Sequence, residues 1–384
     1  MSVPGLKKIK RRFRNLILHL WVALETRRFN LIAAKLVKKA GLRNHAPDHK
    51  IIRQHKELWG RLSKNANTDW YRYFSGATGI EDARFVPLGI YYYHIEPVLN
   101  NKTMSRAYAD KNIYDILYPT IKKPEVYIRF INGYFYDRNY RLIDDKLVNS
   151  PSYFSHITDQ TKNFFMLKPA VRSGRGRWIQ KLSVSNGKLL DSKNNQLTLS
   201  ALKKQLPSDF IIQEYIEQHE CTRQFNPSSL NCIRVFTYRS LNNDRIIPLH
   251  YLQKFGKPGG VTDYGANMGF DSSGKYTRAI SEGHMRLKDS GKHIPVNNLP
   301  PFPFMSEINQ VAREVARLEL HSRVLGIDLA IDKNGQVLLI EVNNSSIGVN
   351  NPQLTGGPLF GDHTEEVIAF CAERKRRFSF VFEF

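Results

Sequence analysis

Two apolar runs near the C-terminal end, joined by a short polar turn, constrain the fold of this chain more than any other feature. The first run is Ile327–Ile331, the second is Val337–Val342, and Lys333–Gln336 between them contains an Asn-Gly pair. Asn-Gly adopts the positive φ angles that tight antiparallel turns need, and here it joins two strand-like runs. The pattern therefore predicts a β-hairpin.

Three oxygen-bearing side chains lie on this predicted hairpin. Asp328 is in the first strand, and Glu341 and Asn343 close the second. Glu341 and Asn343 are two residues apart, so they point to the same side of their strand. Carboxylate and amide oxygens are the ligands that hold Mg²⁺ against phosphate oxygens, which indicates a nucleotide site. An acidic hairpin on a solvated face is the alternative, although the apolar residues before Glu341 argue for burial.

Strand and helix patterns alternate along the rest of the chain, which is typical of an α/β or α+β protein. Helical patterns cover residues 44–75, Asn101–Pro119, Ser200–Lys204 and Ser306–Val324, the last with Ser306 as its N-cap and Gly326 just past its end. Strand patterns cover Pro87–Tyr93, Val126–Ile131, Tyr134–Tyr136 after an Asn132–Gly133 turn, Phe164–Leu167, Trp178–Leu182, Phe210–Gln213, Cys232–Thr237 and Ile246–Leu252. The length of 384 residues favours two or three domains, and we divide the chain into a helical segment at 1–75, a small α/β region at 76–150 and a larger domain at 151–384.

The first 43 residues are strongly basic and carry a regular apolar stripe. They contain twelve Lys or Arg residues and one acidic residue, which gives a net charge of +11 out of +22 for the chain. Apolar residues recur at steps of three or four at Leu6, Ile9, Phe13, Leu16, Ile17, Leu20 and Leu24. The segment is therefore predicted to form a basic amphipathic helix.

Attachment to an anionic membrane surface is the interpretation we favour for residues 1–43, because the apolar face can enter the acyl boundary while the cations meet the headgroups. A packing helix with a solvated basic face is the alternative, and nucleic-acid binding or a targeting peptide fits less well. The apolar run Leu16–Leu24 is too short to span a bilayer. No small-residue cleavage site of a signal peptide follows this run, which argues against secretion. The three cysteines have no CxxC spacing, which argues against a disulfide framework and a structural zinc site. We therefore expect a cytoplasmic protein.

Two further motifs, each weak alone, suggest contacts with a nucleotide. Lys168 follows an apolar strand and precedes the small, cationic, glycine-containing turn at residues 170–177, whose backbone could approach phosphates closely. A later strand runs into an extended linker at Gln213–Glu220, whose backbone could pair with an adenine edge while Glu220 accepts from ribose hydroxyls. On their own, these segments could equally be an ordinary basic turn and an ordinary loop.

Taken in order, the lysine with its glycine turn, the Gln-Glu-Tyr-Ile linker and the hairpin with Asp and Glu-Val-Asn resemble the ATP-grasp superfamily. Residues 87–362 are further similar to the sugar-transfer-associated ATP-grasp family, which is linked to bacterial surface polysaccharide synthesis. The motifs that carry this similarity are Pro227–Thr237, Gly326–Ile331 and Glu341–Asn344. The resemblance implies an ATP-grasp fold with two α/β subdomains that grip ATP.

The resemblance also implies roles for individual residues. ATP phosphates would contact Lys168 and the flexible loop Ser173, Gly174, Arg175 and Gly176. Gln213 would meet the adenine amino group, Glu214, Tyr215 and Ile216 would line the base with the backbone of the last two at the ring edge, and Glu220 would bind the ribose. Two magnesium ions would bind at Asp328, Glu341 and Asn343, and Arg234 would face the transferred phosphate. Many relatives carry an acidic residue where Gln213 stands. A second phosphate-binding lysine is expected before the glycine loop, with Lys122 and Lys123 as candidates.

The segment Lys254–Gly269 is rich in glycine, and we interpret it as a long flexible loop that acts as a lid or binds the acceptor. Lys254 and Asn267 are its candidate catalytic residues. An inert surface loop is the alternative. The aromatic run Phe378–Phe384 could form an edge strand that invites a partner, or it could pack on its own domain.

The function implied by the resemblance is that of a cytoplasmic ATP-dependent ligase. It would join the carboxylate of an amino acid or uronic acid to an amine-bearing or sugar acceptor, such as a polysaccharide precursor, through an acyl phosphate. A lipid-linked acceptor would explain a basic helix held at the inner face of the membrane. The rivals are an ATP-grasp phosphotransferase that phosphorylates a sugar and a non-catalytic membrane-binding adaptor, which would leave Asp328, Glu341 and Asn343 without a role. Nucleic acid is not an expected partner.

Overall fold

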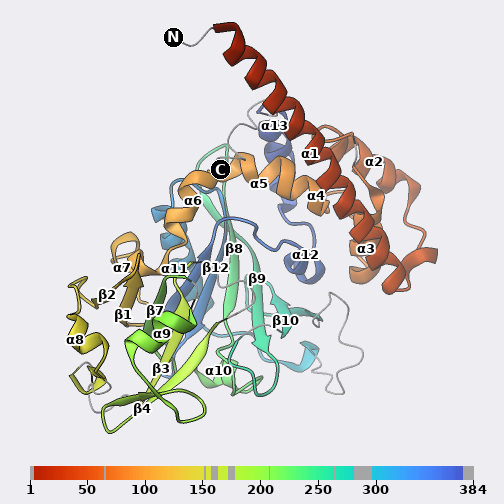
Figure 1. Cartoon of the computed structure of the whole chain (residues 1–384). Helices are drawn as coiled ribbons and strands as arrows, with labels where there is room; N and C mark the ends of the chain where they lie inside the picture. The colour runs from red at the N-terminus through yellow and green to blue at the C-terminus, as the bar shows by residue number, and fades with distance from the viewer. Residues whose placement is uncertain are drawn as a thin grey trace.

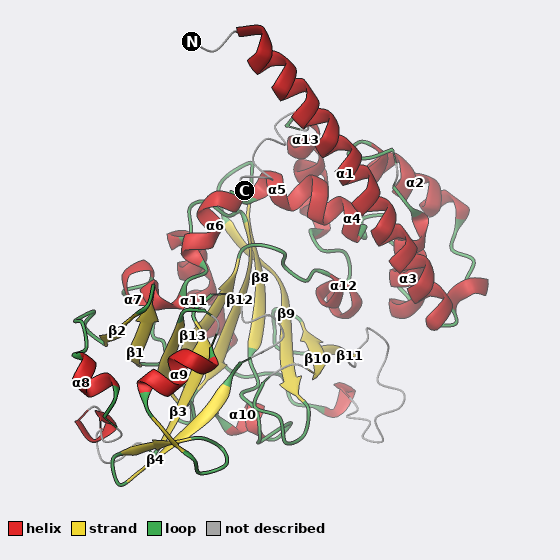
Figure 2. Cartoon of the chain, in the orientation of Figure 1, coloured by secondary structure: helices red, strands yellow, loops and turns green. Residues whose placement is uncertain are grey.

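Two antiparallel sheets lie next to each other in the computed structural model, and a helical region packs against the larger one (Figures 1 and 2). The structure describes residues 4–64, 66–150, 153–156, 163–171, 178–206, 208–262, 265–280 and 296–374. Within these ranges, no helix combines the length and the hydropathy that crossing a bilayer requires.

The smaller sheet, named so because its strands contain fewer residues in total, has seven mostly short strands in the order β2-β1-β7-β3-β4-β5-β6. Its strands are β1 Val126–Ile131, β2 Tyr134–Asp137, β3 Phe164–Pro169, β4 Gln180–Ser185, β5 Lys188–Leu190, β6 Gln196–Leu197 and β7 Phe210–Glu214. The predicted hairpin between β1 and β2 is confirmed, because Asn132 and Gly133 both adopt positive φ angles of 48° and 96°. Since β1 also pairs with β7, the region at 76–150 and the following domain share one sheet.

The larger sheet has six strands in the order β11-β10-β9-β8-β12-β13. Its strands are β8 Ile233–Arg239, β9 Ile246–Gly256, β10 Gly265–Phe270, β11 Tyr276–Ile280, β12 Val324–Ile331 and β13 Val337–Asn343. Helix α11 (Met305–Leu318) buries Ile308, Ala312 and Val315 in the same apolar cluster as Ile327 and Leu329 of β12. One face of the sheet is therefore an apolar core, which leaves the alternate residues of β12 on the other face.

The predicted hairpin of β12 and β13 is confirmed, and it contains a β-bulge that sequence patterning does not reveal. Asp328 is opposite Glu341, whereas the next residue, Leu329, is opposite Leu339, so Ile340 is the extra residue. Leu339 and Val342 both belong to the apolar core although they are three residues apart. The bulge causes this switch in alternation, and it turns Glu341 away from the core and beside Asp328.

The helical region combines both ends of the described chain. Its longer elements are α1 Pro4–Lys39, α2 His49–Gly60, α3 Thr68–Thr78, α6 Lys102–Tyr108, α12 Asn350–Gly356 and α13 Thr364–Glu373, and its short turns are η1 Leu42–Asn44, α4 Leu88–Ile90, η2 Tyr91–Ile95, α5 Glu96–Leu99 and η6 Gly361–His363. Trp59 and Phe74 from the N-terminal part share a core with Phe236 of β8 and Leu354 of α12. The N-terminal helices therefore pack on the larger sheet.

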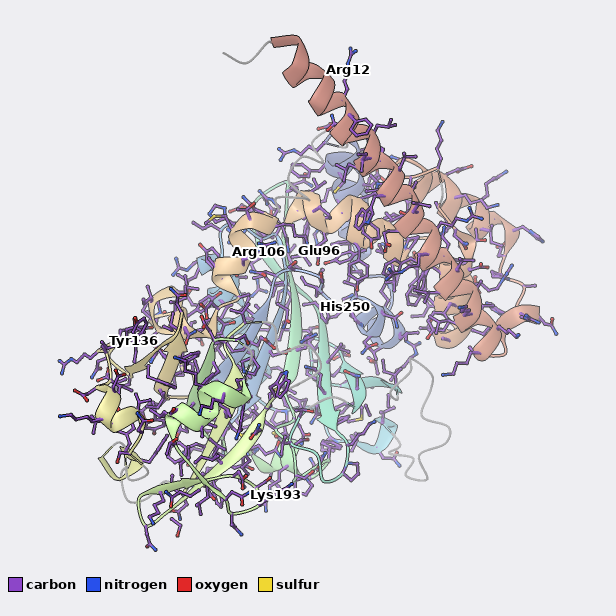
Figure 3. The ribbon with its side chains drawn as sticks, in the orientation of Figure 1. Arg12, Glu96, Arg106, Tyr136, Lys193 and His250 are labelled. Carbon is purple, nitrogen blue, oxygen red and sulfur yellow. The ribbon has the colours of Figure 1, made fainter. Side chains whose placement is uncertain are left out.

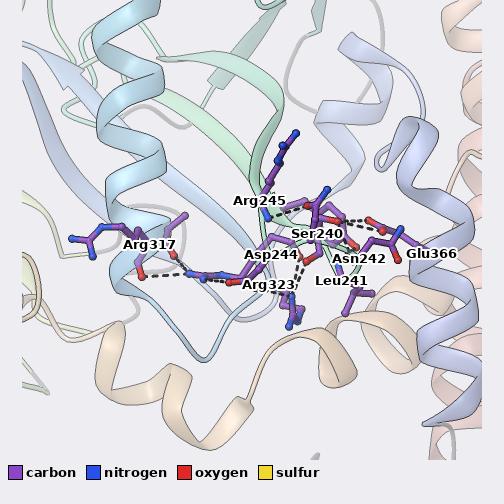
Figure 4. Close-up of polar contacts among 12 residues, drawn as sticks. Ser240, Leu241, Asn242, Asp244, Arg245, Arg317, Arg323 and Glu366 are labelled. Atoms are coloured by element: carbon purple, nitrogen blue, oxygen red, sulfur yellow. Dashed lines mark hydrogen bonds and ion pairs between the residues drawn. The ribbon is translucent and has the colours of Figure 1, made fainter.

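A polar cluster fastens the ends of β8 and β12 to α13 (Figure 4). The Asp244 carboxylate accepts from Arg239 at 3.1 Å and from Arg323 at 3.4 Å. The Ser240 hydroxyl donates to Glu366 of α13 at 3.2 Å. These hydrogen bonds pair polar groups at the strand ends, so we interpret the cluster as one that stabilises the fold.

The remaining short helices are η3 Lys111–Ile113, α7 Tyr114–Leu117, α8 Asp145–Val148, η4 Tyr153–His156, α9 Leu199–Gln205, α10 Glu220–Arg223 and η5 Val296–Asn298. The predicted single helix over Asn101–Pro119 is wrong, because Asp110 caps a new turn by accepting from the Asn112 amide at 2.9 Å. The break places Lys111 at the start of that turn, close to the sheets.

Three other predictions of local structure need correction. Pro87–Tyr93 is helical and not a strand, because burial of Tyr91 in the helical core outweighs the β propensity of its tyrosines. Helix α11 starts after Phe304 and ends at Leu318, since Val324 and Gly326 are already inside β12. The predicted loop Lys254–Gly269 is shorter, because β9 continues to Gly256 and β10 begins at Gly265.

Candidate functional site

A cleft of about 440 Å³ opens where the two sheets meet, with walls from β3, β4 and β7 on one side and from residues 227–230 on the other. The predicted nucleotide residues Gln213, Glu214, Tyr215 and Ile216 all line it. The sheet ladder of β7 ends at Glu214, where it pairs with Phe165. The backbone of Tyr215 and Ile216 therefore runs along the cleft wall beyond the ladder, where a flat heteroaromatic ligand could use it.

The structure does not bring Glu220 to this cleft. The His219 amide donates to the Ile331 carbonyl at 2.9 Å, and helix α10 begins there and carries Glu220 to the surface. Its exposed carboxylate lies 3.9 Å from Arg223. Glu217 lines the cleft in its place and pairs with Lys333 at 3.1 Å.

A lysine between two aromatic rings forms part of the same cleft and was not predicted. The Lys181 ammonium lies 3.9 Å from the ring centre of Phe164 and 4.3 Å from that of Tyr215. Cation–π contacts of this kind hold the lysine and the Tyr215 ring together at the cleft wall. Lys181 is on β4 and Tyr215 follows the end of β7, so only the fold reveals the contact.

A row of charged side chains crosses the open face of the larger sheet. Asp328 on β12 is the register partner of Arg234 on β8, and the guanidinium donates to both carboxylate oxygens at 2.6 Å. Lys254 of β9 donates to the same carboxylate at 3.3 Å. Burial alone would raise the pKa of Asp328, but Arg234 and Lys254 outweigh it and hold that pKa at about 2.

Glu341 continues this row and joins it to the smaller sheet. Its carboxylate accepts from the Lys111 ammonium at 2.7 Å, and Lys111 is almost fully buried. Burial would raise the pKa of Glu341, but the Lys111 charge overcomes it and the pKa is lowered. Lys168, on β3, is also buried, and burial together with Lys111 lowers its pKa to about 7, although Glu341 opposes the shift.

Lys111, like Lys181, is a site residue that the sequence analysis did not predict. The side chain of Lys123 donates instead to the carbonyls of Tyr118 and Ile121, and that of Lys122 is exposed. No local pattern distinguishes Lys111 from other lysines. The preceding Asp110 is a preferred N-cap residue, so it signals that a helical turn begins at Lys111, but it does not signal a role in the site.

The charged cluster around Asp328 and Glu341 contains more positive than negative side chains. Four cations, Arg234, Lys254, Lys111 and Lys168, surround the two carboxylates of Asp328 and Glu341. Four cations beside two carboxylates, counted among the described side chains of this cluster, favour an anionic ligand with several oxygens, such as a triphosphate. The cluster therefore suits a polyphosphate, while the cleft suits a flat base.

The oxygen donors also fit a divalent cation. The side-chain NH₂ of Asn343 donates a hydrogen bond to the Gly326 carbonyl at 3.1 Å, which fixes the orientation of the amide. The amide oxygen then remains as a possible ligand for a metal ion. Among the described residues, no three His, Cys, Asp or Glu side chains gather to hold a metal. A cation here would share its shell between Asp328, Glu341, Asn343 and ligand oxygens, as Mg²⁺ does beside phosphates.

Two predicted groups remain. Asn267 of β10 is the register partner of Lys254, so the two predicted residues of the supposed loop are strand neighbours. Ser173, Gly174, Arg175 and Gly176, the predicted phosphate loop, lie outside the described residues, as does the C-terminal run Phe378–Phe384.

The model of the sugar-transfer-associated ATP-grasp family matches residues 93–367. The chain belongs to this family. The chain therefore has the ATP-grasp fold, and the two antiparallel sheets belong to it. A comparison with curated protein sequences gave no match.

Several solved ATP-grasp structures are similar over part of the chain. The D-Ala:D-Ser ligase VanG from Enterococcus faecalis is 14% identical over 71% of this chain and 64% of its own, with a TM-score of 0.41. The ATP-grasp ligase PsnB, complexed with minimal precursor, Mg and ADP, is 13% identical over 71% and 62%, with a TM-score of 0.38. N5-carboxyaminoimidazole synthase from Aspergillus clavatus, complexed with ADP and a ribonucleotide, is 11% identical over 64% and 46%, with a TM-score of 0.37. The chain spans less than two thirds of each.

Proposed function

We propose that this ATP-grasp protein is an ATP-dependent carboxylate–amine ligase that works through an acyl phosphate. The observation that supports it best is the cluster of Arg234, Lys254, Lys111 and Lys168 around Asp328 and Glu341, next to a cleft that suits a base. The cations come from both sheets, so a triphosphate between the sheets would contact both groups. ATP would lie with its base in the cleft and its phosphates toward the cluster.

The reaction has two steps, and both place negative charge on oxygens near the cations. A substrate carboxylate oxygen attacks the terminal phosphorus of ATP and releases ADP, which leaves an acyl phosphate. An amine then attacks the acyl carbon, the carbon–oxygen bond to phosphate breaks, the amine loses a proton, and inorganic phosphate leaves. Preorganised cations stabilise such charge without reorganising.

The chain offers a residue for each position. Lys111 and Lys168 would hold the ATP phosphates, because they reach the cluster from the side of β3. Arg234 and Lys254 would face the transferred phosphate from the larger sheet. Magnesium, two ions in our proposal, would bind at Asp328, Glu341 and Asn343 and would neutralise phosphate charge.

At the other end of the nucleotide, the Gln213 amide would pair with the adenine edge, helped by the backbone of Tyr215 and Ile216. The side-chain amide of Gln213 can both donate and accept, so it can serve where relatives carry a carboxylate. Lys181 would lie beside the base, where it already contacts the Tyr215 ring.

The substrates we propose are an amino acid or uronic acid as the carboxylate and an amine-bearing or sugar acceptor, such as a surface polysaccharide precursor. The family name supports a link to sugar transfer. We place the protein in the cytoplasm. A lipid-linked acceptor would require the enzyme at the inner membrane face, and this would give the basic helix α1 a purpose.

The test is ATP turnover with magnesium and hydroxylamine over a panel of amino acids, uronic acids and amino sugars. Hydroxylamine traps an acyl phosphate as a hydroxamate, so ADP and hydroxamate should appear together with one carboxylate. Glu341→Gln should abolish both, whereas Glu314→Gln, on the exposed side of α11, should not. ADP accompanied by a phosphorylated sugar and no hydroxamate would establish the phosphotransferase, and absence of turnover across the panel would count against an enzyme of this substrate class.

A further inference from the structure

Helix α1 has one apolar face that packs on the protein. Leu18, Val22, Ala33 and Val37 are buried, and their spacing places them on one side of the helix. Trp21 contacts the ring of Tyr93 edge-to-face at 5.1 Å between centroids. This face fixes α1 on the helical region, so it accounts for the position of the helix but not for its other apolar residues.

A second apolar face lies on the opposite side of α1 and is open to solvent. Phe13, Leu16, Ile17, Leu20 and Leu24 are all exposed, with 64% of Phe13 and 66% of Leu24 accessible. At 3.6 residues per turn they fall within an arc of about 100°, roughly half a turn from the packed face. These are stripe residues that the sequence pattern identified. The interpretation of that stripe as a packing surface therefore does not hold for these five residues.

Exposed cations flank this second face. Arg12, Arg27 and Arg28 are exposed on α1, and Arg12 is on the part of the helix that extends beyond the rest of the molecule (Figure 3). The only acidic residue of the first 43, Glu25, is turned to the protein, where it accepts from the Tyr93 hydroxyl at 2.9 Å and pairs with Arg28. By helical spacing Arg12 and Arg28 lie at the two sides of this face, and Arg27 lies beyond its C-terminal end, so cations surround the apolar residues.

A shallow groove continues the same surface onto α2 and α3. The groove has a volume of about 740 Å³, and Leu20, Ala23 and Leu24 form its apolar wall. Its charged residues are the cations Arg27 and Lys56 and the carboxylate of Asp69, which pairs with Arg72 at 3.4 Å. An apolar stripe with cations at its margins matches acyl chains below anionic headgroups. A second copy of the chain matches poorly, since it would bring two segments of net charge +11 together.

We propose that the exposed face of α1 docks on an anionic lipid bilayer. The helix lies in the plane of the headgroups, Phe13, Leu16, Ile17, Leu20 and Leu24 enter the acyl boundary, and Arg12, Arg27 and Lys56 meet lipid phosphates. The opposite face stays on the protein, so the bilayer holds the whole molecule through α1. This inference does not depend on the ligase reaction.

The test is sedimentation of the full-length protein with two kinds of vesicle. One contains phosphatidylcholine with about one third phosphatidylglycerol, and the other contains phosphatidylcholine alone. We expect binding to the anionic vesicles that weakens with salt, as screening requires, and more than ten-fold weaker binding to the neutral ones. The double substitution Leu20→Glu and Leu24→Glu should reduce anionic binding more than ten-fold. Both leucines are exposed, so the substitutions leave the core intact.

The matched control is Ile116→Glu with Leu142→Glu, two leucine-sized residues that are 64% and 62% exposed on other surfaces. Its binding should equal that of the unmodified protein. Equal binding by the α1 variant, or no binding to anionic vesicles at all, would overturn the proposal. A dimer in sedimentation velocity without lipid, converted to monomer by the α1 variant, would also overturn it and identify the face as an interface between copies.

Discussion

The buried Lys168 should make ATP binding depend on pH near neutrality. Burial and the neighbouring Lys111 lower the pKa of Lys168 from 10.5 to about 7, which corresponds to a cost of about 5 kcal/mol for carrying the charge without a ligand. A bound phosphate favours the charged form, so it raises this pKa and the site takes up a proton. Since only the protonated form pairs with phosphate, affinity should be constant below pH 6 and should fall about ten-fold between pH 6 and pH 8.

Isothermal titration calorimetry with Mg·ATP measures both effects. Titrations at pH 8 in two buffers of different ionisation enthalpy should show uptake of close to one proton, and titrations at pH 6 should show little. Lys168→Arg should flatten the profile, because a guanidinium stays charged. Lys333→Arg, at the exposed rim of the cleft, is the control and should keep the pH dependence. An affinity that is equal at pH 6 and pH 8 in the unmodified protein would refute the reasoning.

Three further substitutions follow from the same structure. In steady-state kinetics, Lys111→Met should raise the KM for ATP at least ten-fold, whereas the control Lys122→Met should change it by no more than about two-fold. Similar KM values for the two variants would contradict a contact between Lys111 and ATP. Arg234→Lys loses the forked contact with Asp328, so kcat should fall about 100-fold with a smaller change in thermal stability, and an unchanged kcat would contradict its place at the phosphate. Burial lowers the pKa of His250, labelled in Figure 3, from 6.5 to about 4, so the folded state resists its protonation. Stability should fall by up to about 3 kcal/mol as the pH drops from 7 to 4, and His250→Gln should show a shallower loss in urea unfolding.

Strong local patterns predicted much of the two sheets. Asn132 and Gly133 specified one hairpin, and the Asn-Gly pair between Ile331 and Val337 specified another, because tight turns need particular backbone angles. Pro87–Tyr93 misled the prediction, since aromatic residues favour strands when nothing else is known. Its helical form depends on packing against residues distant in the sequence.

The site was predictable where chemistry and alternation coincide. Glu341 and Asn343 were expected to share a side, yet the bulge at Ile340 that turns Glu341 from the core has no sequence signature. Lys111 and Lys181 escaped prediction because their partners come from other strands and turns. Glu220 is exposed because it is the first residue of helix α10, a short helix that the sequence analysis did not predict.

The acyl phosphate is the central claim, and an isotope experiment tests it most directly. The substrate carboxylate is labelled with ¹⁸O, and the released phosphate is analysed by mass spectrometry. The proposed reaction breaks the bond between the acyl carbon and the phosphate oxygen, so one ¹⁸O atom should move from the carboxylate into each inorganic phosphate. Phosphate without ¹⁸O, in the presence of product formation, would contradict the account.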